Sequence, residues 1–402
     1  MKMTNKTSFM AIVLCILCTM IHAQVKLLKS DLIKFDFNQL ANNKSKIQHK
    51  DAALMPAYNQ LIKDADKSLE FKPVSVMDKK DFPPSGNKHD YMSIAPYWWP
   101  DTAKPNGLPY IKKDGEVNPE VANYPDKENF PKVIRNIYTL SLAYYFSGEE
   151  KYAAHASKLI QVWYLDTATR MNPNLNFGQA VKGVITGRAE GIIDTRHFVY
   201  LIDAVEILKG SKSWTTQHQT TLKQWFSEFL SWLQNSKIGI KEMKAKNNHG
   251  VWYDAQTLAI ALYIDSTDLA NKTVNNVLTR LDKQMDEKGL FPLELERTTS
   301  LHYSVFIMNA FEIVAQLSEK TKTNLWTAKT SSGKTFKQAF DAIYPFLTDK
   351  KKWEYKQITE YDYADGINLL LRADSRFNCI TCIEDIKYIA KQNYIIQLFN
   401  LL

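Results

Sequence analysis

"VIRNIYTLSLAYYFSGEEKYAAHASKLIQVWYLD", residues 133–166, decides the fold class of this chain. Apolar side chains recur at helical spacing in both halves of the stretch. They are Ile134, Ile137 and Leu140 in the first half and Tyr152, Leu159 and Trp163 in the second. Ser147-Gly148 separates the halves, and glycine is the preferred residue at a helix C-terminus. The stretch therefore predicts two helices joined as a hairpin.

The same periodicity recurs along most of the chain. Further amphipathic helices are predicted within residues 187–210, 220–236, 247–263, 269–289, 300–320 and 336–349. Successive antiparallel helices with one apolar face can either close into a ring or stack as a solenoid. No strict sequence repeat is present, so the sequence favours a closed, all-α (α/α) toroid of helical hairpins in a single domain.

The N-terminus has the pattern of a cleaved secretory signal. Lys2 and Lys6 precede an apolar run over residues 9–21, and Ala23 stands before Gln24. We expect a signal peptide over residues 1–23, a toroid domain over 24–402, and export to the periplasm or the medium. No later segment has the apolar length of a membrane span. Removing two lysines from the formal net charge of +8 leaves +6, which weakly favours acidic partners.

Cysteine usage points to a local feature only. After the signal, the chain contains Cys379 and Cys382, spaced as "CITC". A single CxxC is half of a zinc site and lacks the strand-helix context of a thioredoxin motif. We expect a short local disulfide or two unpaired thiols.

Two segments, residues 89–120 and 171–197, do not fit the helical pattern. Long irregular segments are usually functional or pack as covers. Aromatic planes beside cations would suit a groove for an acidic sugar chain, because sugar rings stack on aromatic faces and carboxylates pair with Arg. Alternatively, the tryptophans plug one end of the toroid and the arginines form structural ion pairs. The candidate binding residues are Tyr97, Trp98, Trp99, Gln179, Arg188, Arg196 and His197.

The helix predicted over residues 247–263 begins with an unusual cluster of hydrogen-bonding side chains, "NNH". Helix capping explains one of Asn247 and Asn248 but not both, and His249 follows them. About fifty residues later, "LELERTTSLHYSVF" places Arg297 shortly before a helix and Tyr303 at its start. The two clusters suggest one chemistry.

That chemistry is β-elimination from a uronate. Removing the C5 proton adds negative charge beside a carboxylate, so Asn248, His249 and Arg297 could stabilise the developing enediolate. Tyr303 could protonate the departing O4, and could also act as the base if both groups lie on one face of the sugar. Its pKa near 10 would then need lowering by a neighbour such as Arg297. If the groups lie on opposite faces, His249 is the natural base. No metal or other cofactor is required, and no HExxH motif is present.

"YMSIAPYWWPD", "NNHGVWYD" and "LERTTSLHYS" resemble the alginate lyase superfamily of polysaccharide lyases, most closely family thirty-eight from Bacteroidetes. The resemblance implies an incomplete (α/α) toroid with the active site in a groove. It also implies a catalytic set of Asn248, His249, Arg297 and Tyr303, while Tyr253, one turn beyond His249, could share the proton transfer. The implied substrate is alginate, with glucuronan as the alternative. We expect a monomer that binds an acidic polysaccharide and neither nucleic acid nor membrane.

Two other classes of function remain open. A glycoside hydrolase would need two carboxylates that face the scissile bond, for which Glu294 with Glu296, or Glu190 with Asp194, could serve. A non-catalytic glycan-binding protein would keep the aromatic and basic groove without the catalytic clusters. Trp252, Tyr263 and Phe306 are expected in the core.

Overall fold

The computed structural model describes residues 32–390. The predicted signal peptide at residues 1–23 lies outside this range. Among the described residues, no helix is both long enough and apolar enough to cross a membrane.

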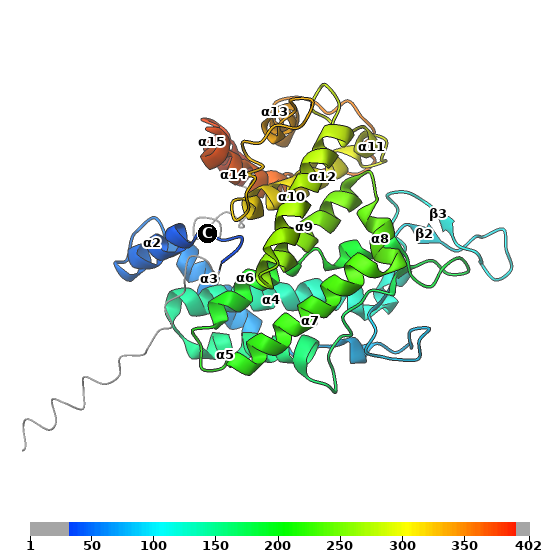
Figure 1. Cartoon of the computed structure of the whole chain (residues 1–402), viewed down its shortest axis with the longest axis horizontal. Helices are drawn as coiled ribbons and strands as arrows, with labels where there is room; N and C mark the ends of the chain where they lie inside the picture. Colours follow the sequence, from blue (N-terminus) through cyan, green and yellow to red (C-terminus); the bar gives the residue numbers. More distant parts are fainter. Residues whose placement is uncertain (1–31, 391–402) are drawn as a thin grey trace, which may run out of the picture.

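Helices dominate the described chain, and the strands are short (Figure 1). The α-helices are α2 (Phe37–Gln48), α3 (Met55–Leu69), α4 (Pro125–Ser147), α5 (Glu150–Ile160), α6 (Phe198–Leu208), α7 (Thr216–Asn235), α8 (Lys237–Met243), α9 (Asn248–Tyr263), α10 (Thr267–Gln284), α11 (Pro292–Leu295), α12 (Ser300–Ser318), α13 (Phe336–Leu347), α14 (Ile367–Phe377) and α15 (Cys382–Ala390). The strands are β1 (Met92–Ile94), β2 (Trp98–Trp99), β3 (Ile111–Lys112) and β4 (Phe177–Ala180). Short 3-10 segments include η4 (Ala189–Thr195).

The helical hairpin predicted from residues 133–166 is confirmed. α4 ends at Gly148, whose φ of 76° is left-handed and whose N–H donates to the Tyr144 carbonyl at 2.8 Å. Glycine adopts this conformation without the steric cost that a side chain would add. α5 then runs back against α4.

α9 and α12 form the centre of the fold. Nearly every side chain of α9 is buried, because α6, α7, α8, α10 and α12 all pack against it. A helix surrounded in this way is apolar on most of its circumference, as "VWYDAQTLAIALY" is. The prediction of an all-α toroid is confirmed, and every segment predicted to be helical contains a helix.

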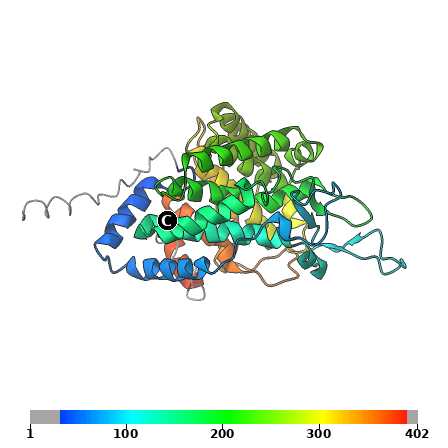
Figure 2. The same ribbon diagram turned by 90° about the horizontal axis from the view of Figure 1, so that it is seen from below.

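The two irregular segments meet on one side of the toroid. β1 from the first segment pairs in parallel with β4 from the second. η4 follows and passes so close to β4 that a Cβ on Gly191 would lie 2.5 Å from the backbone of Gly178. β2 and β3 form an antiparallel hairpin that projects from the helical body on the side opposite α2 (Figures 1 and 2).

Cys379 and Cys382 form a disulfide at the start of α15. Of the two expected states, the structure therefore has the local disulfide and not the unpaired thiols. Cys382 is buried, while Ile380 between the cysteines is almost fully exposed.

Candidate active site

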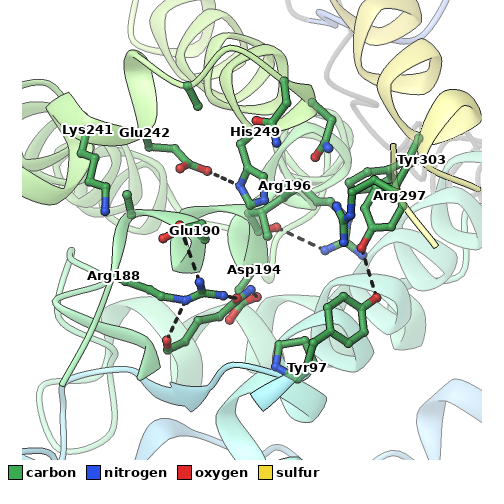
Figure 3. Close-up of a pocket in the computed structure, with 18 of the residues that line it drawn as sticks. Tyr97, Arg188, Glu190, Asp194, Arg196, Lys241, Glu242, His249, Arg297 and Tyr303 are labelled. Atoms are coloured by element: carbon green, nitrogen blue, oxygen red, sulfur yellow. Dashed lines mark hydrogen bonds and ion pairs between the residues drawn. The ribbon is translucent and has the colours of Figure 1, made fainter. Parts of the chain in front are cut away.

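A cavity of about 720 Å³, called the first cavity, lies where α9 and α12 begin (Figure 3). η4, α8 and the segment that contains β2 complete its walls. Nine of the residues predicted to act in catalysis or substrate binding line it: Tyr97, Trp98, Gln179, Arg188, Arg196, Asn248, His249, Arg297 and Tyr303. The two helix entrances therefore meet at one site.

Asn248 is the first residue of α9 and is fully buried. Its backbone N–H and its Nδ2 donate to the two carboxylate oxygens of Glu294, at 2.6 and 2.8 Å. Among the described residues, Asn248 Oδ1 has no hydrogen-bond partner. Asn247 stands at the N-cap position but its side chain makes no capping bond. The expectation that one of these amides caps α9 is wrong, and both side chains instead line the cavity.

His249 is held by a buried carboxylate. Its Nδ1 lies 2.6 Å from Glu242 Oε1 on α8. Burial lowers the pKa of His249, but attraction to Glu242 and the hydrogen bond with it outweigh burial, so the net pKa is raised. With Nδ1–H donated to Glu242, a protonated ring also has an N–H at Nε2. His249 is thereby suited to donate to an anion.

A carboxylate on the loop that follows β3 holds Arg297 in place. Its Nε and Nη2 donate to the carboxylate of Asp114, at 3.0 and 2.7 Å. This bidentate geometry orients the guanidinium plane. Asp114 is followed by Gly115 with φ of 83°, where a Cβ would lie 2.5 Å from Thr298 Oγ1. The turn therefore needs glycine to bring Asp114 against Arg297.

Tyr303 lies at the boundary of the cavity, with its hydroxyl donating to that of Tyr97 at 3.2 Å (Figure 3). The Arg297 guanidinium lies 3.5 Å from the centre of its ring. Burial raises the pKa of Tyr303; Arg297 lowers it and Tyr97 raises it further, so the net pKa is raised. Arg297 thus shifts the pKa of Tyr303 in the expected direction, but the opposing effects are larger. Tyr303 therefore stays protonated in the free protein and can act as a proton donor.

A buried network supports the opposite wall. Asp194 accepts hydrogen bonds from Tyr91 and Ser93 on the β1 segment and from Gln179 Nε2 on β4. Gln179 has φ of 48°, a left-handed conformation that is strained for a residue with a side chain. Its Oε1 accepts from Arg188 at 2.9 Å. The network thus places Arg188 at the cavity while joining β1, β4 and η4.

Three residues predicted to bind substrate lie elsewhere. Tyr253 faces the interior, where its hydroxyl donates to the Leu233 carbonyl at 3.3 Å. Trp99 lies on β2 outside the first cavity, and its Nε1 donates to the Glu116 carbonyl. His197 lines a second cavity of about 520 Å³ on the other side of Tyr303.

The core assignment was correct for Trp252 and Tyr263, which are 4% exposed. It holds only in part for Phe306, which packs against the core but is partly exposed and lines both cavities.

Positive charge dominates the first cavity. The sequence analysis did not predict four of the cations that line this cavity. It also did not predict Asp114 and Glu242, the carboxylates that hold Arg297 and His249, although Glu242 lies seven residues before His249 on the adjoining helix. Seven Lys or Arg side chains line it against three acids; the cations are Lys112, Lys127, Arg188, Arg196, Lys241, Lys244 and Arg297, and the acids are Glu190, Asp194 and Glu242. Such a lining favours a polyanionic ligand.

Three of the four carboxylates considered for hydrolysis are engaged in structural contacts, and the fourth, Glu296, is exposed and does not line the first cavity. Glu294 is fully buried, and its two carboxylate oxygens accept hydrogen bonds from Asn248. Asp194 is the centre of the network described above, and Glu190 lies 3.5 Å from Arg188. None of these contacts arranges a pair of carboxylates around a site for a glycosidic bond.

Known proteins resemble this chain in sequence and in fold. The alginate lyase family matches residues 75–353 of the chain. A crystal structure of an alginate lyase from Bacteroides ovatus is 37% identical, with a TM-score of 0.84, covering 90% of this chain and 95% of that one. Alginate lyase A1-III from Sphingomonas species A1 is 14% identical, with a TM-score of 0.47, covering 78% of this chain and 86% of that one. None of the curated proteins compared with the chain matched it. The chain belongs to the alginate lyase family and is a polysaccharide lyase.

Proposed function

We propose that this protein cleaves a polyuronate, with alginate as the first choice, by metal-independent β-elimination. One observation carries the proposal: Asn248, His249 and Arg297 converge with Tyr303 on one cationic cavity, and each of the three is held by its own carboxylate. Donors fixed before substrate binds need little reorganisation as charge develops in the transition state.

In this mechanism the three donors neutralise the carboxylate of the sugar that loses its C5 proton. The C5–H electron pair forms the C4=C5 bond while the C4–O4 bond breaks, and Tyr303 gives its proton to O4. Where H5 and O4 lie on one face of the ring, Tyr303 must first lose its proton; the phenolate then takes H5 and passes that proton to O4. Where they lie on opposite faces, neutral His249 takes H5 at Nε2, Tyr303 gives its own proton to O4, and only Asn248 and Arg297 neutralise the carboxylate. The products are a new chain end and an unsaturated uronate.

The remaining cavity residues bind the chain around the reacting sugar. Trp98 and Tyr97 offer aromatic faces, and Arg188 and Arg196 offer guanidinium groups for neighbouring carboxylates. Arg196 suits this role because its guanidinium donates only to the Ile193 carbonyl, at 3.2 Å, and has no carboxylate partner among residues 32–390. We further propose that the protein is exported and acts as a monomer.

Alginate is the first choice because the matching Bacteroides ovatus protein is described as an alginate lyase. Glucuronan is the alternative, because donors aimed at a carboxylate do not sense the configuration at C2 or C5.

The test is ultraviolet absorbance during reaction with poly-mannuronate, poly-guluronate, glucuronan and a pectic uronan, each alone. Absorbance from the conjugated double bond, with one of the first three substrates, is the expected result and identifies the substrate. New reducing ends without that absorbance would mean hydrolysis and would overturn the proposal.

Treatment with a chelator tests metal independence separately. The rate on the preferred polymer should stay unchanged, because every role in the mechanism is filled by a side chain. Loss of activity that added metal restores would contradict this part of the proposal.

A further inference from the structure

The second cavity is separated from the first by the contact between Tyr97 and Tyr303. Both tyrosines line both cavities, as do Arg196 and Phe306. The hydroxyl proposed to act on the substrate therefore lies between two adjoining spaces of about 720 and 520 Å³.

The two cavities differ in charge. Arg196 supplies the only Lys or Arg side chain among the described residues that line the second cavity, which also contains the carboxylates of Glu312 and Asp365. His197 there is neutral near pH 7, because burial first and then the nearby Arg196 and Arg135 lower its pKa to about 3. A run of carboxylates would gain little from this lining beyond Arg196.

The second cavity instead offers unused hydrogen-bonding groups. Within residues 32–390, the side chains of His197, Tyr200 and Asn368 make no hydrogen bond, although all three line the cavity. Asn309 Oδ1 is buried and likewise has no hydrogen-bond partner among the described residues. His197, Tyr200 and Asn368 are only partly buried, so their polar groups are open to a ligand, whereas a buried oxygen such as Asn309 Oδ1 is normally paired. Together they are suited to a ligand rich in hydroxyls.

His302 adds a donor whose tautomer is fixed by its surroundings. Gln357 Oε1 accepts from the Leu301 N–H at 3.0 Å, so its Nε2 must be the group that faces His302 Nδ1 at 2.8 Å. Nδ1 then accepts, and the proton of a neutral ring lies on Nε2.

The position of Tyr303 fixes the direction of the chain. O4 belongs to the sugar whose carboxylate binds Asn248 and His249, and it links that sugar to its neighbour on the non-reducing side. A chain that places this sugar in the first cavity and O4 at Tyr303 must carry the neighbour past Tyr303.

We propose that the second cavity binds the sugar on the non-reducing side of the cleaved bond, an inference that rests on the proposed function. The pyranose is held through its hydroxyls, and its carboxylate is turned to Arg196. The polyanionic remainder on the reducing side lies in the first cavity, toward Lys241 and Lys244. Both lysines are exposed and line only that cavity.

The test uses uronate hexasaccharides, cut from the polymer that the wild-type protein cleaves and labelled at the reducing end. The variants are His197→Ala and Asn368→Ala in the second cavity, and Lys241→Ala with Lys244→Ala in the first. Lengths of the labelled fragments report which bond is cut.

Weakening the second cavity favours complexes with more sugars in the first, so cleavage should move toward the non-reducing end. The ratio of long to short labelled fragments should rise about fivefold, the size expected for one net hydrogen bond. The lysine variants should shift the ratio the opposite way.

Shifts of the same sign in both sets, reversed signs, or no shift in the second-cavity variants would overturn the proposal. Asn368→Ala alone decides the matter if His197→Ala loses its helical circular dichroism. Failure of the proposed function would look different, because the wild type would then yield no unsaturated product.

Discussion

The two walls of the first cavity are built from different kinds of structure. One wall consists of helix entrances, which supply Asn248, His249 and Tyr303. The other wall comes from irregular segments, which supply Tyr97 and also Asp114, the carboxylate that holds Arg297. The difference suggests a division of roles, in which the helix entrances carry the chemistry and the irregular segments align it and bind the chain. Changes on the first wall should then lower kcat, and changes on the second should act mainly on KM.

Tyr303→Phe should have the largest effect. It removes the proton donor but keeps the ring that packs against Arg297, so kcat should fall by about 10²- to 10⁴-fold. Polymer binding and helical circular dichroism should be unchanged. The matched control is Tyr97→Phe, which removes the partner hydroxyl from the other wall and should cost much less. Substantial turnover by Tyr303→Phe would remove Tyr303 from the acid role.

Loss of a carboxylate donor should come next. Asn248→Ala or Arg297→Ala should each cost at least about 2.7 kcal/mol in kcat/KM, the size of one lost oxyanion-type donor. Arg297→Lys is the control, because it keeps the charge but loses the bidentate contact with Asp114. A much smaller loss in the alanine variants would mean that the substrate carboxylate binds elsewhere.

The helical wall was largely predictable from sequence, and the physical reason is local. A helix start is set by a few adjacent residues, so "NNH" and the interval from Arg297 to Tyr303 could be placed at helix entrances without knowing the fold. The toroid followed in the same way from the apolar period of 3.6 residues.

The partners of these residues depend on tertiary contacts, which no local pattern encodes. Asp114 reaches Arg297 across 183 positions, and Glu294 reaches Asn248 across 46. Sequence reasoning also placed Tyr253 by helical spacing alone, one turn from His249. The structure buries that side of α9, because α7 packs there and its Leu233 carbonyl accepts from Tyr253.

Glu242→Gln tests the charge of His249 through pH. The raised pKa keeps His249 protonated from low pH up to that pKa, so a donor role predicts that kcat/KM falls as pH rises through it. Without the Glu242 charge, burial dominates and the pKa drops, so the fall should move to lower pH, with a loss of about tenfold near neutral pH. If His249 is instead the base, activity rises with pH through its pKa, and the variant moves that rise to lower pH. Whether kcat/KM falls or rises as pH passes through the pKa of His249 therefore decides between the two roles.

Asp114→Asn should have the smallest effect, because it keeps the shape of the contact while removing its charge. Asp114 and Arg297 are both partly exposed, and pairs of this kind contribute about 0.2–1 kcal/mol. We expect KM to rise up to about fivefold with kcat nearly unchanged, measured by initial rates of double-bond formation. Raising the salt concentration should narrow the gap from wild type, since it screens the lost charge. A fall in kcat as large as that of Arg297→Ala would instead mean that the loop wall takes part in the chemical step, and the division between the two walls would have to be abandoned.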